Sequence, residues 1–165
     1  MKSVKYFIQF LIIFFLFLIF KILGLNFASY LSGKIASFVG PLFRSRKLIE
    51  ANILKALPNS SEEEIENITK KMWINYGKIL AEYVFIKDFR GSKFENKIEV
   101  KGLKILEEIN KNNEPVIFIS GHFNNFELMA MQIEKSNVNV AALYRPLNNK
   151  FLNFIMERIR KKYIC

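Results

Sequence analysis

The chain has 165 residues, of which 51% are hydrophobic and 15% aromatic, and it carries a formal net charge of +10. This length suits one domain with a buried core, or a domain with an anchor, and so apolar a composition excludes a disordered chain. With one cysteine and one histidine, the sequence excludes an internal disulfide and a Cys/His zinc site built from this chain alone. We therefore expect no metal, while the charge leaves nucleic acid, anionic lipid and an acidic carrier protein open as partners.

The basic residues are unevenly distributed along the chain. Residues 1–50 contain seven Lys or Arg and one acidic residue, residues 51–100 contain eight of each kind, and residues 101–165 contain ten and six. A protein that follows a nucleic-acid backbone presents a continuous basic stripe, which the neutral middle interrupts. We therefore expect no nucleic-acid partner.

The most apolar stretch is Tyr6–Phe20, in which Gln9 is the only strongly polar residue and which lies between Lys5 and Lys21. A helix needs about 20 apolar residues to cross a bilayer, so this stretch is marginal as a span and sufficient for an interfacial anchor. A cleaved signal peptide would show an A-x-A-like site, and a soluble core helix would show a polar face; the stretch has neither. We interpret residues 1–31 as an uncleaved membrane anchor, with basic residues at both ends leaving its orientation open.

Residues 32–90 are expected to form a helical platform. Apolar residues at helical spacing predict a helix over 44–57, and Pro58 follows its end. A serine precedes a glutamate by three residues twice, at 60 and 63 and at 61 and 64, so either pair can form a capping box for a helix running to about Phe85. The apolar face predicted for that helix consists of Ile65, Ile68, Met72, Tyr76, Ile79 and Tyr83.

Residues 91–165 are expected to form the N-terminal part of an α/β domain. Short apolar runs predict buried strands, and each is followed by a segment with helical spacing. The order predicts a β-α-β-α unit with parallel strands, in which ligands bind at the carboxyl ends of the strands, where His122 and Arg145 fall. The expected strands are residues 97–100, 115–120 and 138–144. The expected helices are residues 103–109, a helix that starts within 121–128 and runs to about 133, and residues 149–163.

The chemistry predicted for this unit centres on His122 and Glu127. Within a continuous helix the two would lie about 140° apart, but they can meet if His122 leaves a strand and Glu127 begins a helix. The carboxylate then binds one imidazole nitrogen and the other nitrogen acts as a general base on an attacking hydroxyl. Near the helix N-terminus, which could stabilise an oxyanion, Asn124 or Asn125 would donate to that oxygen or cap the helix, and we expect capping for at least one. A purely structural histidine and a solvated Arg145 remain the alternatives.

Two blocks of this sequence carry a family resemblance. Ser120–Leu128, which reads Ser-Gly-His-Phe-Asn-Asn-Phe-Glu-Leu, resembles the signature of the late acyltransferases of lipid A biosynthesis. These are lauroyl and myristoyl transferases of the Gram-negative inner membrane, within the wider His-x4-Asp/Glu acyltransferase group. The segment Tyr144–Asn149, followed by a basic helix, is similar to the second block of the family, and Arg44, Asn52 and Pro58 fit its layout.

The resemblance implies a reaction and roles for particular residues. His122 would be the general base, Glu127 its orienting partner and Arg145 a substrate contact. From their position beside the helix start, Asn124 and Asn125 are further candidates for binding substrate. A fatty acyl chain would pass from acyl carrier protein to a hydroxyl of a phosphorylated glycolipid, the lipid A precursor, without a cofactor or a covalent enzyme intermediate. The protein would be located at the bacterial inner membrane, with its catalytic part on the cytoplasmic side.

Relatives in this family continue well beyond the point at which this chain stops. We therefore expect the sequence to be truncated at its C-terminus, and the polypeptide alone to be inactive or weakly active. The alternatives to lipid A acylation are a glycerolipid acyltransferase and a catalytically inactive, membrane-associated fragment.

Overall fold

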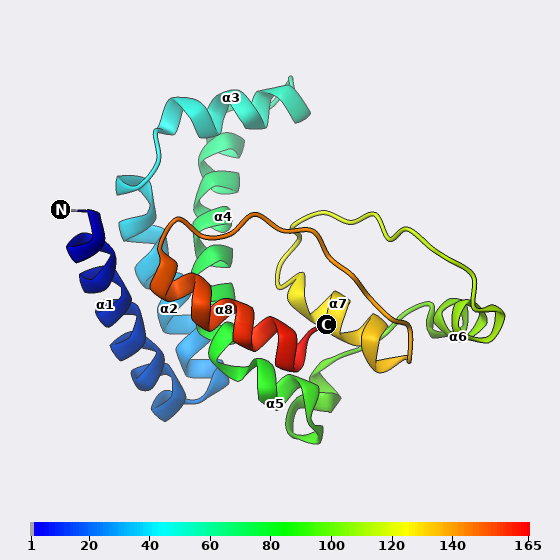
Figure 1. Cartoon of the computed structure of the whole chain (residues 1–165). Helices are drawn as coiled ribbons and strands as arrows, with labels where there is room; N and C mark the ends of the chain where they lie inside the picture. Colours follow the sequence, from blue (N-terminus) through cyan, green and yellow to red (C-terminus); the bar gives the residue numbers. More distant parts are fainter. Residues whose placement is uncertain (1) are drawn as a thin grey trace. The chain divides into compact units, whose positions relative to one another are not determined.

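The computed structural model describes residues 2–165, and every regular element in that range is helical (Figure 1). Three short 3-10 turns, Gly40–Leu42, Tyr83–Phe85 and Ser92–Lys97, lie between the longer helices. The chain divides into two compact units: one comprises Ile19–Val84, and the other comprises the residues up to Leu18 together with Phe85–Cys165. The α-helices are α1 (Lys2–Leu23), α2 (Leu25–Val39), α3 (Arg46–Ala56), α4 (Glu62–Glu82), α5 (Ile86–Arg90), α6 (Leu103–Asn112), α7 (Glu127–Lys135) and α8 (Lys150–Tyr163).

Helix α1 contains the apolar stretch predicted to be an anchor. It is 22 residues long, and only 6% of its most apolar 18-residue window is buried within this chain. By length and composition it is able to cross a membrane. Gly24, with a φ of 75°, separates α1 from α2 in a conformation that glycine adopts without steric cost.

In the unit Ile19–Val84, α2 packs along α4 through small residues (Figure 1). Ser32 and Gly33 are buried on α2. A Cβ atom built on Gly77 of α4 would overlap the carbonyl oxygen of Ser32 and lie 2.7 Å from the Cβ of Ala36. The two backbones therefore approach more closely than side chains of ordinary size would allow. The hydroxyl of Ser29 also donates to a carboxylate oxygen of Glu82, at 3.1 Å.

The face of α4 that is buried differs from the apolar face predicted for this helix. Ile65 and Tyr83 are buried as expected, but Tyr76 is about half exposed. Helix α4 instead buries Gly77 and Ala81 in its second half. The prediction followed the spacing of large apolar residues only. Where two helices approach closely, small residues such as glycine and alanine are buried, and that spacing does not include them.

Several helices form where the sequence predicts them. Ser61 and Glu64 form the capping box of α4: the Ser61 hydroxyl accepts from the Glu64 amide at 3.2 Å, and the Ser61 amide donates to the Glu64 carboxylate at 2.8 Å. The helices expected over 44–57, 103–109 and 149–163 are confirmed as α3, α6 and α8.

The α/β fold class was wrong. None of the strands expected at 97–100, 115–120 and 138–144 forms within residues 2–165, so no β-α-β-α sheet is present there. The segments 115–120 and 138–144 border a hollow of about 830 Å³, and no backbone hydrogen bond joins them. Ile117 and Ile119, expected in a buried strand, are 87% and 93% exposed. A strand is stabilised only by pairing with neighbours, and a lone two-stranded parallel pair is marginal in water.

In the other unit, a single arginine joins three helices. Arg90 of α5 donates from Nη1 to the carbonyl oxygen of Tyr163, at 3.1 Å, at the end of α8. Its Nη2 pairs with Glu134 of α7 at 2.6 Å. Helices α7 and α8 are therefore both fastened to α5. The largest buried apolar side chains of this unit are Phe85, Ile86, Phe89, Met131 and Ile164.

The start of α8 is fastened to α1 within the same unit. Asn149 caps α8 by accepting a hydrogen bond from the amide of Phe151 at 3.1 Å. Its Nδ2 donates to the carbonyl oxygen of Tyr6 at 2.8 Å and to the amide oxygen of Gln9 at 3.4 Å. The ring of Phe151 lies 5.8 Å from that of Phe10. Gln9, the one strongly polar residue of the apolar stretch, thus has a structural partner.

We expect Gly77→Ala to lower the free energy of unfolding by about 1–2 kcal/mol, because the overlap with α2 outweighs the better helix propensity of alanine. Urea unfolding followed by the fluorescence of the single tryptophan, Trp73 on α4, measures this. Gly91→Ala is the matched control, since a Cβ there meets nothing closer than 3.6 Å. Equal stability of the two variants would contradict the close approach of α2 and α4.

Candidate active site

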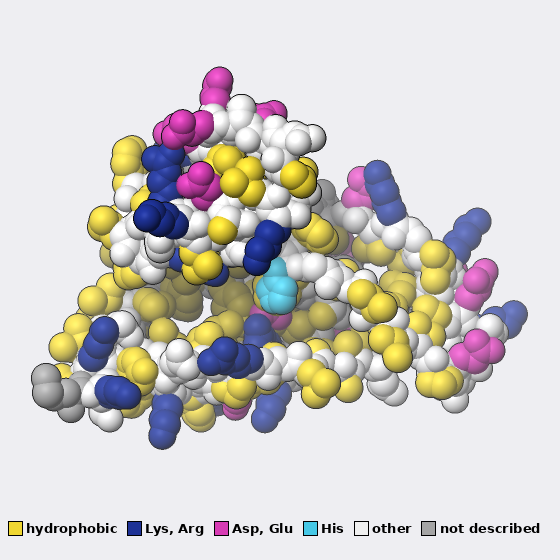
Figure 2. Space-filling view, turned by 90° about the horizontal axis from the view of Figure 1, so that it is seen from above, with side chains coloured by type: hydrophobic (Ala, Val, Ile, Leu, Met, Phe, Trp, Pro, Cys, Tyr) yellow, Lys and Arg dark blue, Asp and Glu magenta, His cyan; other side chains and the backbone are white. Residues whose placement is uncertain are grey.

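His122 lies in an irregular turn that leads into α7. Its imidazole is exposed, forms the cyan group visible in Figure 2, and packs on the ring of Phe126 with 4.3 Å between centroids. Asn124 adopts a left-handed conformation, with a φ of 47°, so the chain reverses between the histidine and the helix. The turn is held by the Phe126 amide, which donates to the Asn124 carbonyl oxygen at 3.1 Å.

The two asparagines do not cap α7 as expected. The N-cap residue is Phe126, and no side chain forms a capping hydrogen bond there. At the start of α7 a backbone group accepts instead: the amide of Leu128 donates to the carbonyl oxygen of Asn125 at 3.1 Å. The capping prediction rested on side-chain preference, which a tight turn with satisfied backbone groups overrides. Neither Asn124 nor Asn125 is among the residues that line the cavity beside His122.

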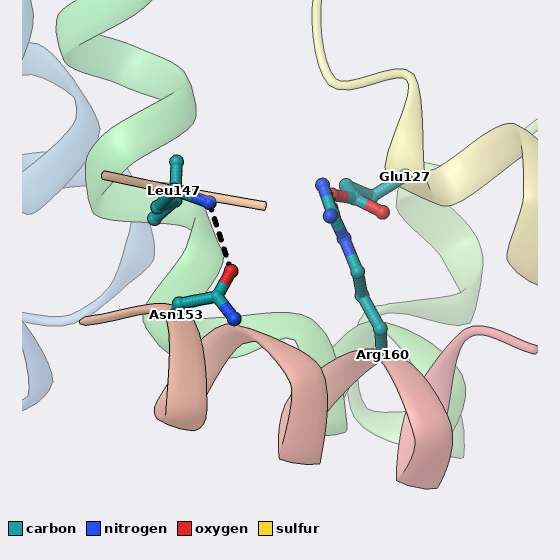
Figure 3. Close-up of polar contacts among 4 residues, drawn as sticks. All are labelled: Glu127, Leu147, Asn153 and Arg160. Carbon is teal, nitrogen blue, oxygen red and sulfur yellow. Dashed lines mark hydrogen bonds and ion pairs between the residues drawn. The ribbon is translucent and has the colours of Figure 1, made fainter. Parts of the chain in front are cut away.

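Glu127, the first residue of α7, is buried and paired with Arg160 of α8. The Glu127 side chain is only 6% exposed, and the guanidinium of Arg160 donates to its Oε1 from Nε, at 2.9 Å, and from Nη2. Figure 3 shows Arg160 rising from α8 toward Glu127 at the start of α7. Both of these bonds fall on Oε1, so Oε2 accepts from neither nitrogen. The pair compensates a carboxylate that would be costly to bury alone.

Arg160 is a site residue that the sequence reasoning missed. It was seen only as part of the basic helix that follows the second block. The available signal was the strong amphipathic pattern of α8, whose positions 157 and 160 lie on one face of the helix, toward the cavity. That pattern does not identify Glu127 as the partner, because the two residues are 33 positions apart.

The segment that carries Arg145 is attached to α8 on both sides of this residue. Before it, the hydroxyl of Tyr144 donates to Glu157 at 2.6 Å. After it, the amide of Leu147 donates to the side chain of Asn153 at 2.9 Å (Figure 3). The guanidinium of Arg160 also lies over the Tyr144 ring, 4.8 Å from its centroid. These contacts fix an extended segment that has no strand partner.

The hydrogen bond between Tyr144 and Glu157 shifts both pKa values. The hydrogen bond from Tyr144, and to a smaller extent the one from Asn153, lowers the pKa of Glu157 from its ordinary value of 4.5. The same bond to a charged acceptor raises the pKa of Tyr144 from its ordinary value of 10.0, and partial desolvation adds to the increase. The contact therefore requires a protonated phenol and an ionised carboxylate.

His122, Glu127, Arg145 and Arg160 all line one cavity of about 620 Å³. The structure thus brings together the three principal residues expected from the sequence and adds a second arginine. It does not place His122 and Glu127 in a hydrogen bond with each other. The apolar part of the lining includes Phe126, Ala130, Val140, Leu143, Met156 and Ile164.

This arrangement suits an anionic, partly apolar ligand. The guanidinium of Arg145 can bind phosphate or stabilise a developing oxyanion, while that of Arg160 is paired with Glu127. The apolar lining can accept a hydrocarbon chain. Lys161 adds a third positive charge to the lining. Among residues 2–165, no group of three His, Cys, Asp or Glu side chains is arranged to hold a metal ion.

Comparison with known proteins agrees with this chemistry. The family described as bacterial lipid A biosynthesis acyltransferase matches residues 1–163. The chain belongs to this family. Lipid A biosynthesis acyltransferase 2 of Shigella flexneri is 30% identical over 142 residues, which cover 84% of this chain and 44% of that protein. Lipid A biosynthesis myristoyltransferase of Escherichia coli (strain K12) is 27% identical over 131 residues, 79% of this chain and 40% of that protein.

The resemblance seen in the sequence is therefore confirmed at the level of the lipid A acyltransferase family. The chain spans less than half the length of these relatives. No solved structure matches it.

We expect Arg160→Leu to destabilise this acyltransferase-family fold by about 3 kcal/mol, because it leaves the Glu127 carboxylate buried without its counter-charge. Urea unfolding followed by far-UV circular dichroism measures the loss. Arg158→Leu is the matched control: it removes the same group two residues earlier on α8, where the side chain is exposed. A change of less than about 1 kcal/mol would be typical of a surface ion pair and would contradict the buried pair.

We expect Tyr144→Phe to move the pKa of Glu157 part of the way back toward 4.5, since Asn153 continues to donate. The stabilising contribution of the contact is fully present above pH 4.5 and is lost as the pH falls through the lowered pKa of Glu157. On the alkaline side it is fully present below pH 10.0 and is lost as the pH rises through the raised pKa of Tyr144. Carbon-13 NMR titration of glutamate carboxyl groups measures the shift, with Tyr163→Phe as the control; an unchanged Glu157 would rule the contact out.

Proposed function

We propose that this chain carries the acyl-transfer site of a lipid A acyltransferase. It would move a fatty acyl group from acyl carrier protein to a hydroxyl of a phosphorylated glycolipid, the lipid A precursor. The observation that carries the proposal is the single cavity lined by His122, Glu127, Arg145 and Arg160. Family membership supports the reaction class, while the donor and the acceptor are part of the proposal.

In the proposed reaction, His122 acts as the general base. Its imidazole removes the proton from the acceptor hydroxyl as the oxygen attacks the carbonyl carbon of the acyl thioester. The new carbon–oxygen bond forms, the carbon–sulfur bond breaks, and the thiol leaves with the proton returned by the imidazolium. Exposure of His122 at the cavity supports this role, because both substrates must reach it.

Glu127 is proposed to orient the imidazole during the reaction. Arg160 holds one carboxylate oxygen and thereby fixes the other, Oε2, for a hydrogen bond from His122. In this structure the imidazole makes no hydrogen bond to Glu127 and its ring packs on Phe126, so that bond would form on a change in the orientation of the ring. Catalytic hydrogen bonds commonly shorten only when substrate is bound, so the separation of the two groups is consistent with this role.

The charged groups of the cavity suit the proposed substrates. Arg145 and Lys161 would bind the phosphate of the acceptor, and the positive end of the α7 dipole would stabilise the oxyanion formed on the acyl carbonyl. The net charge of +10 favours association with acyl carrier protein, which is acidic. Helix α1 is proposed to anchor the protein in the bacterial inner membrane, with the site on the cytoplasmic side.

The chain spans 44% of the first relative and 40% of the second, so transfer by this polypeptide alone is part of the proposal. The alternatives are a membrane-associated polypeptide without activity and an acyltransferase with another acceptor. A glycerolipid acyltransferase would use the same base on a smaller phosphorylated acceptor. The transfer assay below includes both cases.

The test uses acyl carrier protein loaded with a labelled fatty acid, and either the lipid A precursor or glycerol 3-phosphate as acceptor. We expect the label on the lipid A precursor, and His122→Ala to lower the rate by at least about 100-fold, the lower range for general-base catalysis. Glu127→Gln should also lower it, whereas Glu108→Gln, the same change at an exposed carboxylate of α6, should not.

Label on glycerol 3-phosphate would favour the glycerolipid enzyme. Absence of transfer by the unsubstituted chain would favour the inactive fragment, and transfer that persists in His122→Ala would exclude the proposed mechanism.

A further inference from the structure

An exposed apolar cluster lies at the end of α2, in the unit Ile19–Val84. Phe38, Leu42 and Phe43 are 78%, 83% and 80% exposed, and we name these three residues the apolar tip. They lie on and around the 3-10 turn Gly40–Leu42, which connects α2 to the loop before α3. Single exposed apolar residues are ordinary, but a cluster of large ones marks an interaction surface.

The turn that presents the tip is built into the fold. A Cβ atom on Gly40 would overlap the indole of Trp73, so the backbone of the turn rests directly against α4. Pro41 occupies the start of the turn, where its fixed φ favours this conformation. The amide of Phe43 donates back to the carbonyl oxygen of Gly40 at 2.9 Å. The exposure of the tip therefore comes from a braced turn rather than from a loosely attached loop.

Three basic residues follow the tip in the sequence. Arg44, Arg46 and Lys47 follow it directly, and the first acidic residue of the sequence is Glu50. Arg46 pairs with Glu62 at 3.3 Å, but both side chains are exposed, and such pairs are weak. A cavity of about 320 Å³ beside the turn is lined by three basic residues, Arg44, Arg46 and Lys70, and by one acidic residue, Glu66.

The outer face of α2 also combines exposed aromatic rings with a basic residue. Phe27 and Tyr30 are more than half exposed, on the side of the helix opposite the small residues that pack against α4. Lys34 lies over the ring of Tyr30, 5.8 Å from its centroid. Exposed aromatic rings with basic side chains beside them are typical of surfaces that lie in a membrane interface.

We infer that the apolar tip inserts into the interface of a membrane that contains anionic lipid, as a contact separate from helix α1. Lipid accounts for both parts of the surface: the acyl region receives Phe38, Leu42 and Phe43, and the anionic headgroups receive Arg44, Arg46 and Lys47. An acidic protein partner would account for the charges, but it would need an apolar pocket inside its acidic surface to receive the same three side chains. The inference does not require acyl transfer.

The test places an environment-sensitive NBD fluorophore on the tip. Leu42→Cys is made in a Cys165→Ser background, so that the label has one attachment site, and the protein is mixed with vesicles of phosphatidylcholine with or without phosphatidylglycerol. We expect a blue shift and a rise in emission that are larger with phosphatidylglycerol. Leu57→Cys, at the other end of α3, is the control: it is also exposed and apolar but should show little change. Binding through α1 affects both labelled proteins, so their difference reports the tip.

A triple variant, Arg44→Gln, Arg46→Gln and Lys47→Gln, tests the charges. We expect it to remove the effect of phosphatidylglycerol on the Leu42 label, since each basic residue near an anionic surface changes binding about fivefold.

Equal responses at positions 42 and 57, or a blue shift that grows with protein concentration without vesicles, would overturn the inference, the second outcome indicating a second copy of the chain. A response to acyl carrier protein and not to vesicles would overturn it in favour of a protein partner. None of these samples contains an acyl donor and acceptor together, so failure here leaves the transfer assay unaffected.

Discussion

The arrangement of the site depends on the ion pair between Glu127 and Arg160. A carboxylate that is almost completely buried stays ionised at little cost only beside a fixed positive charge, and Arg160 supplies that charge from α8. The pair joins the helix that follows His122 to the helix that holds the Arg145 segment. Because α5 also holds both helices through Arg90, the turn and the segment are kept around one cavity.

The parts of the site that could be predicted from the sequence are those that depend on neighbouring residues. The His-x4-Glu spacing requires a turn followed by a helix start, and the structure has both. The capping box of α4 likewise depends on two residues three positions apart. Arg160 could not be found in this way, because its partner is distant in the sequence and is selected by the packing of α7 and α8. The His122–Glu127 hydrogen bond remains part of the proposed mechanism.

The error in fold class has the same physical origin. A helix satisfies its own backbone hydrogen bonds, so a local pattern is enough to predict it, and α3, α6 and α8 form as expected. A strand satisfies its groups only through another strand, and no local pattern can supply one. Residues 115–120 have the composition of a buried strand, yet Ile117 and Ile119 are almost fully exposed. The apolar run therefore predicted the extended backbone of this segment correctly, but the pairing with a neighbouring strand is not present.

The exposed apolar surfaces of this protein differ in whether their backbone groups are hydrogen-bonded. Helix α1 and the apolar tip expose large side chains on backbone whose hydrogen bonds are largely made, and both lie among the first 49 residues, which contain no acidic residue. Residues 115–120 expose comparable side chains, but no backbone bond pairs this segment with 138–144. Each unpaired backbone group would cost several kcal/mol in hydrocarbon, so the backbone of this segment, as it stands in this chain, is poorly suited to lipid contact. The helical backbone of α1 and the turn that presents the tip carry no such cost, which is why apolar side chains alone do not identify a lipid-binding surface.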